Sequence, residues 1–125
     1  MYSKKQKVLI IDDNEEIRDL VARTLHGTEF HVLQASDGSE SIRIAKEHKP
    51  DVILLDIIMP KFDGYLTGKV LKRNISTKKI PIIFLTGKKT KEDINAAVLI
   101  LYFKTNRSIA MLLIRNEDFK NKKDR

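Results

Sequence analysis

Three aspartates close two apolar runs of the chain. Asp12 and Asp13 follow residues 8–11, and Asp56 follows residues 52–55. Each run has the length and composition of a buried parallel strand, and the carboxyl ends of such strands meet at one edge of an open α/β sheet. Carboxylates that lie close together repel unless a cation or a proton intervenes. Because hard divalent cations prefer oxygen ligands, the three residues predict a metal site at this edge.

The acidic pair also has an interpretation without a metal. One of Asp12 and Asp13 can cap the helix that follows, since acids are favoured at helix N-termini. Capping accounts for one acid of the pair and not for both. It also leaves Asp56 unexplained, so the metal site remains the leading interpretation of the three together.

Strand and helix patterns alternate along the chain. The predicted strands are apolar runs at residues 8–11, 30–34, 51–56 and 80–85. Amphipathic helices are predicted from apolar residues at helical spacing that begin at Ile17, Ile42, Ile94 and Ile109. Gly27 is expected to cap the first helix at its C-terminus, and Asp37-Gly38 and Asp63-Gly64 to open the second and third. This alternation predicts one parallel sheet with helices on both faces.

Composition narrows the class of protein. The 125 residues suffice for one domain, there is no cysteine for disulfides or thiol chemistry, and the net charge is +7. No apolar stretch approaches the roughly 20 residues that span a bilayer, and residues 1–7 lack an apolar signal-peptide core. We therefore expect a cytoplasmic protein without membrane contact. The basic clusters are interpreted as solvated surface rather than as a nucleic-acid site, because no arginine-rich helix accompanies them.

Five segments together resemble the receiver domain of two-component response regulators. They are VLIIDDN at residues 8–14, ASDG at 35–38, PDVILLD at 50–56, MPKFDG at 59–64 and PIIFLT at 81–86. Their order and spacing carry the resemblance, which spans residue 7 to about residue 115. It implies a flavodoxin-like, doubly wound, five-stranded parallel sheet. Residues 1–125 would form a single receiver domain with a basic polar tail at about 117–125.

The resemblance implies a role for each matching residue. Asp56 matches the phosphoacceptor, which takes a phosphoryl group from a histidine kinase or phosphotransfer protein. Mg²⁺ would be bound by Asp12, Asp13, Asp56 and the backbone carbonyl of Ile58. Thr86 and Lys104 would contact the phosphoryl group, and Gly87 matches the small residue beside Thr86. Such a domain is a signalling phosphoacceptor that phosphorylates and dephosphorylates itself with Mg²⁺, rather than an enzyme, and its phosphorylation switches binding of a downstream protein.

One region departs from the family pattern. Thr86 and Lys104 are 18 positions apart, fewer than is usual in the family, and Thr105 stands where proline is expected. Residues 96–103 contain no Gly, Pro, Asn or Asp to turn the chain from a helix into a strand. We expect a shortened fourth helix, a short irregular fifth strand at residues 100–104, and weakened switching. If the helix continues instead, its uncovered apolar face would favour weak homodimers or partner binding.

Two other functions are weighed against the phosphorylatable receiver. The first is a receiver-like interaction module with impaired switching, which the short Thr86–Lys104 interval favours. The second is a flavodoxin-type electron carrier on a similar sheet. Its first turn would need glycine or hydroxyl residues to bind the FMN phosphate, whereas this chain has acids at residues 12–16. The cognate kinase and output partner stay open, as does whether the chain stands alone or is part of a longer regulator.

Overall fold

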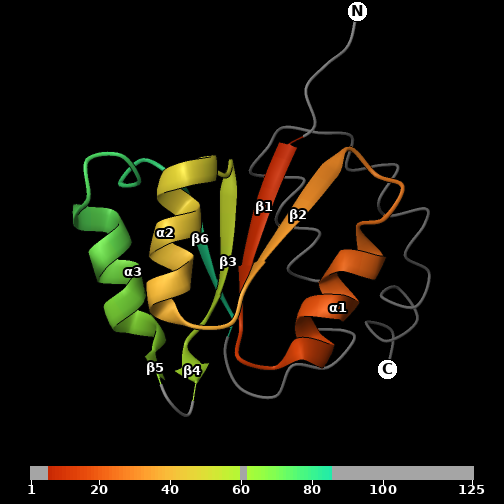
Figure 1. Ribbon diagram of the computed structural model, residues 1–125, viewed down its shortest axis with the longest axis horizontal. Coiled ribbons are helices and arrows are strands. Elements are labelled where there is room, and N and C mark those ends of the chain that lie inside the picture. The colour runs from red at the N-terminus through yellow and green to blue at the C-terminus, as the bar shows by residue number, and fades with distance from the viewer. Residues whose placement is uncertain (1–5, 60–61, 86–125) are drawn as a thin grey trace, which may run out of the picture.

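The computed structural model describes residues 6–59 and 62–85. Its main sheet is parallel, with strand order β2-β1-β3-β6. Helix α1 lies on one face of the sheet, and α2 and α3 lie on the other (Figure 1). The bounds are β1 Gln6–Ile11, α1 Glu15–Thr24, β2 Phe30–Ala35, α2 Gly38–His48, β3 Val52–Asp56, α3 Gly64–Arg73 and β6 Ile82–Leu85. The predicted doubly wound α/β fold is confirmed. The expected fifth strand and the last two helices lie outside the described residues.

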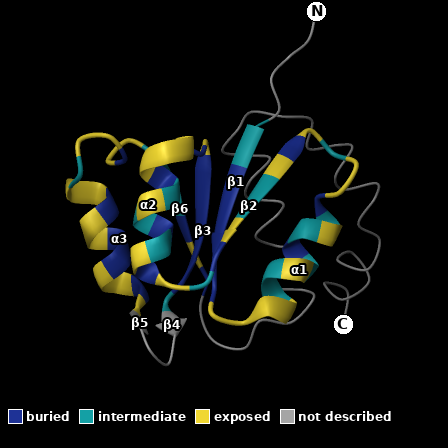
Figure 2. Ribbon diagram, viewed as in Figure 1, coloured by how far each residue is buried: buried dark blue, intermediate teal, exposed yellow. Residues whose placement is uncertain are grey.

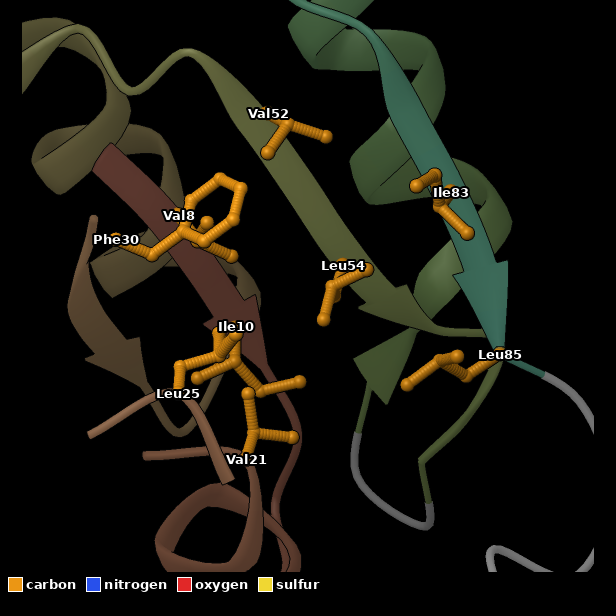
Figure 3. Packing of buried hydrophobic residues seen from close by; sticks show 9 residues of the cluster. All are labelled: Val8, Ile10, Val21, Leu25, Phe30, Val52, Leu54, Ile83 and Leu85. Carbon is orange, nitrogen blue, oxygen red and sulfur yellow. The ribbon is translucent and has the colours of Figure 1, made fainter. Parts of the chain in front are cut away.

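Residues 8–11 of β1 and all of β3 are buried, as the dark ribbon in Figure 2 shows. Their side chains alternate between two cores. One core packs beneath α1 and appears in Figure 3; its strand members include Val8, Ile10, Val52 and Leu54. The other packs beneath α2 and α3 and includes Leu9, Ile11, Ile53 and Leu55. Two-sided burial explains why both strands are continuous apolar runs.

Each of the three helices in the described part of the chain begins at a polar cap. Asn14 caps α1 by accepting from the Glu16 N–H, whereas Asp37 and Asp63 cap α2 and α3. The predicted helix starts at residues 37–38 and 63–64 are therefore confirmed. Because Asn14 caps α1, helix capping accounts for neither acid of the preceding pair. None of these helices, within residues 6–59 and 62–85, has the length and apolar character needed to cross a membrane.

Several predicted boundaries are wrong. Strand β1 begins at Gln6 rather than at Val8, β2 ends at Ala35 rather than at Gln34, and β3 begins at Val52 rather than at Asp51. Strand β6 begins at Ile82 rather than at Ile80, because the Ile80 N–H donates to the Thr77 carbonyl at 3.0 Å and so belongs to the preceding turn. Helix α1 has Leu25 as its C-cap. Gly27, predicted to be that cap, follows two residues later with a φ of +78° and serves the turn into β2.

A short hairpin between β3 and α3 was not predicted. It consists of β4, Ile58–Met59, and β5, Phe62–Asp63, which pair in antiparallel orientation. The sequence indicated only a turn and a helix start here. The hairpin lies at the end of the sheet where β1 and β3 finish (Figure 1), so it borders the residues considered next.

Candidate functional site

The three predicted acids meet at the carboxyl edge of the sheet. Asp56 is the last residue of β3, and Asp12 directly follows β1, whose final residue pairs with Leu55. One carboxylate oxygen from each of Asp12, Asp13 and Asp56 lies within 4.8 Å of the others. Asp12 and Asp56 have no exposed surface, whereas Asp13 is exposed. The cluster therefore has two buried members beneath one that faces solvent.

Backbone and side-chain hydrogen bonds fix the loop that carries Asp12. The Asn14 N–H donates to Asp12 Oδ1 at 2.9 Å, and the Asp12 N–H donates to the Ala35 carbonyl at 3.1 Å. Arg18 donates from Nη1 to the Asp12 carbonyl at 2.7 Å and from Nε to Gln34 Oε1 at 3.2 Å. Helix α1 and strand β2 thus both hold this loop in place.

Sequence reasoning missed Arg18 and Asn14. Arg18 could have been noticed from its position in the first half of α1. The helix dipole favours acids over bases there, so a base at this position is unexpected. A cation placed there needs a local partner, which the Asp12 carbonyl supplies. Asn14 was overlooked because the two acids before it are equally good capping residues.

Two backbone hydrogen bonds fix Ile57, the residue directly after Asp56. The Ile57 N–H donates to the Leu85 carbonyl at 3.1 Å, and the Ile57 carbonyl accepts from the Gly64 N–H at 3.3 Å. Ile58, whose carbonyl is a predicted metal ligand, pairs with Asp63 across the hairpin. The backbone of Ile57 is therefore held by β6 through its N–H and by the start of α3 through its carbonyl.

Three further predicted residues lie outside the described part of the chain. They are Thr86, Gly87 and Lys104. In sequence, Thr86 directly follows Leu85, which pairs with Asp56 across β3 and β6. Their roles stay predictions.

The donor set fits Mg²⁺. The ion prefers hard oxygen ligands in octahedral geometry and usually retains several waters, so one or two carboxylates suffice. Three carboxylates within 4.8 Å of one another repel unless positive charge lies between them. A small divalent ion relieves that repulsion, and exposed Asp13 leaves one side of the cluster open to solvent.

Comparison with known families identifies the chain. Residues 8–101 match the response regulator receiver domain, and this range contains the three clustered acids. The chain belongs to the response regulator receiver domain family. Its members are receiver domains of two-component response regulators, and this is the class of signalling protein to which the chain belongs.

Relatives and solved structures agree with that family. The chain is 38% identical over 88 residues to the alkaline phosphatase synthesis transcriptional regulatory protein PhoP of Bacillus subtilis; the match covers 70% of this chain and 36% of PhoP. It is 32% identical to protein PilH of Pseudomonas aeruginosa, over 70% of this chain and 72% of PilH. The chemotaxis response regulator CheY4 of Vibrio cholerae superposes with a TM-score of 0.62 at 34% identity, covering 74% of this chain and 79% of CheY4. This receiver domain thus spans about a third of PhoP but most of PilH.

Proposed function

We propose that this receiver domain is a Mg²⁺-dependent phosphorylatable switch with Asp56 as the phosphoacceptor. The observation that carries the proposal is the carboxylate cluster, with Asp56 buried at the end of a central strand and two further acids within 4.8 Å. A histidine kinase or phosphotransfer protein is the proposed donor. The phosphorylated domain then changes its affinity for a downstream protein.

The proposed transfer is a single displacement at phosphorus. A carboxylate oxygen of Asp56 forms a bond to phosphorus, and the bond from phosphorus to the donor breaks, with its electron pair leaving on the donor. An aspartate can carry the group as an acyl phosphate. Phosphoryl transfer depends on positioning and charge neutralisation more than on acid–base groups. Mg²⁺, when bound, supplies that neutralisation.

The residues of the proposed site divide between binding the metal and contacting the phosphoryl group, and Asp56 also serves as a metal ligand. Asp13 and Asp56 bind the metal through carboxylate oxygens, Asp12 acts mainly through water, and the Ile58 carbonyl adds a ligand. Thr86 and Lys104 contact the phosphoryl oxygens, with Lys104 acting as a point charge on a flexible stem. Residues 1–125 are proposed to form one domain, located in the cytoplasm.

Replacing Asp56 tests the proposal. The protein is incubated with acetyl phosphate and Mg²⁺, and intact mass is measured with and without EDTA. We expect the wild type to gain one phosphoryl group only when Mg²⁺ is present. Asp56→Asn should show no mass gain, because the amide is a poor nucleophile. The substitution also removes one negative charge from the metal cluster.

Asp19→Asn is the matched control, because Asp19 is an exposed acid on α1 outside the cluster. It should gain mass as the wild type does. A gain that persists in Asp56→Asn would place the acceptor elsewhere. A wild type that never gains mass would support the alternative of a receiver-like interaction module with impaired switching, which the short Thr86–Lys104 interval favours.

A further inference from the structure

The start of α3 lies against the backbone at the end of β3. A Cβ atom at Gly64 would lie 2.1 Å from the Asp56 carbonyl oxygen, 2.7 Å from Ile57 Cα and 2.9 Å from the Ile57 carbonyl oxygen. Real Cβ atoms do not come within 3.0 Å of such neighbours. All three neighbours are backbone atoms, so no side-chain rotation can make room for a larger residue at position 64.

The backbone on either side of this contact is anchored. Ile57 is hydrogen-bonded to Leu85 and to Gly64 itself. Gly64 is buried and begins a helix whose first turn is capped by Asp63. Room for a Cβ can therefore come only from moving the helix start away from β3 or from shifting the peptide at residues 57–58.

We propose that Gly64 is a positioning residue for the metal site. Its missing side chain lets the hairpin close onto β3 and so fixes the Ile58 backbone relative to the Asp56 carboxylate. The inference rests on the proposed function, in which the Ile58 carbonyl and Asp56 are both ligands. Mg²⁺ demands near-ideal octahedral geometry, so a shift at residues 57–58 weakens its binding.

Gly68 supplies a matched control on the same helix. A Cβ at Gly68 would lie 3.2 Å from Cζ of the Phe84 ring. This atom is the end of the Phe84 side chain, and Phe84 is 41% exposed, so the ring can move aside. Gly68→Ala therefore makes the same chemical change one turn further along α3 without pressing on the backbone beside Asp56.

The test compares metal affinity with stability. Mg²⁺ is titrated into metal-free wild type, Gly64→Ala and Gly68→Ala while backbone amide signals are followed, with no phosphoryl donor present. Urea unfolding in EDTA gives the free energy of unfolding of each protein without metal. We expect Gly64→Ala to raise the Mg²⁺ dissociation constant on the order of tenfold or more, as replacing residues that orient metal ligands does elsewhere. Gly68→Ala should bind Mg²⁺ as the wild type does.

Each other outcome has a defined meaning. Equal Mg²⁺ affinity in folded Gly64→Ala and Gly68→Ala would overturn the positioning role. If Gly64→Ala is unfolded in buffer, the titration is repeated with trimethylamine N-oxide, which favours compact states. A chain that remains unfolded would assign Gly64 to folding in general and also overturn the proposal. A wild type that shows no response to Mg²⁺ would instead contradict the proposed function on which the inference rests.

Discussion

Capping helix α2 lowers the pKa of the Asp37 side chain. Its Oδ1 accepts from the Glu40 N–H at 2.8 Å and from the Ser39 hydroxyl at 3.0 Å. These hydrogen bonds, the Glu40 bond foremost, hold the pKa of Asp37 below its ordinary value. Hydrogen bonds to a carboxylate favour its charged form, so the native state prefers Asp37 ionised.

This lowered pKa predicts a pH-dependent contribution to stability. A depressed native pKa stabilises the fold above the unfolded pKa, about 3.9 for aspartate, and that contribution is lost as pH falls through the native value. Asp37→Asn keeps the cap but cannot titrate. Urea unfolding should therefore show the wild-type advantage over Asp37→Asn at neutral pH shrinking below about pH 4.

Asp37→Ala is the companion variant, because it removes the cap itself. We expect it to lower the free energy of unfolding by about 1 kcal/mol at neutral pH. Identical pH profiles for wild type and Asp37→Asn would show that the carboxylate charge contributes nothing here.

The sequence predicted individual residues of the carboxylate cluster where the residue type and its position both indicate one role. The three acids were found because each follows a buried apolar run. The close approach of Gly64 could not be found this way, because it depends on how the hairpin at residues 58–63 pairs. The Asp12 carbonyl likewise attracts Arg18 only once α1 has its orientation against the sheet.

The end of helix α2 stores strain at the scale of an element. Lys49 is its C-cap and has a φ of +48°, a left-handed conformation that costs a residue with a side chain roughly 1–2 kcal/mol. The residue also precedes Pro50, which disfavours helical conformations before it. Glycine adopts this conformation readily but loses more entropy on folding.

Lys49→Gly should therefore stabilise the protein. We expect the free energy of unfolding to rise by roughly 0.5–1 kcal/mol, after the entropic cost of glycine is subtracted. Gly27→Ala is the converse, because Gly27 has positive φ in open space; it should lose about 1 kcal/mol. Urea unfolding measures both. A lower stability for Lys49→Gly would mean that the lysine side chain stabilises the turn by more than the strain costs.

Long and well-buried strands were predicted from the sequence, whereas short strands were not. Strands β1 and β3 were found because both faces are covered, which leaves an unbroken apolar run. Strands β4 and β5 have two residues each, too few to show any periodicity. The start of β6 was misplaced because Ile80 is apolar and partly buried although its N–H belongs to a turn.

At the scale of the whole molecule, β6 forms one edge of the sheet in the part of the chain that the structure describes. Within the described residues, β6 pairs only with β3, and an open strand edge favours a further partner. Residues 96–103 contain no turn residue between the predicted fourth helix and fifth strand. The departure from the family pattern therefore concerns the part of the domain beyond β6.

We expect weak switching in this segment. Hydrogen exchange at residues 96–105 should show modest protection that changes little when beryllium fluoride, a phosphoryl mimic, is added with Mg²⁺. Lys104→Ala should reduce phosphorylation of Asp56 only modestly. Strong protection that rises sharply with the mimic would instead reveal a fully working switch.

The central position of β1 also has a consequence for folding. Asp12 and Asp56 meet only after β1 and β3 pair in parallel, and such non-local pairing forms slowly because a long loop must close first. The unfolded chain therefore has no carboxylate cluster, and the repulsion among the three acids arises only as the sheet assembles. A cation that binds the native cluster and not the unfolded chain stabilises the fold by mass action. If Mg²⁺ binds at the proposed site, a higher Mg²⁺ concentration therefore raises the folded fraction of the chain. The same ion also promotes phosphorylation of Asp56.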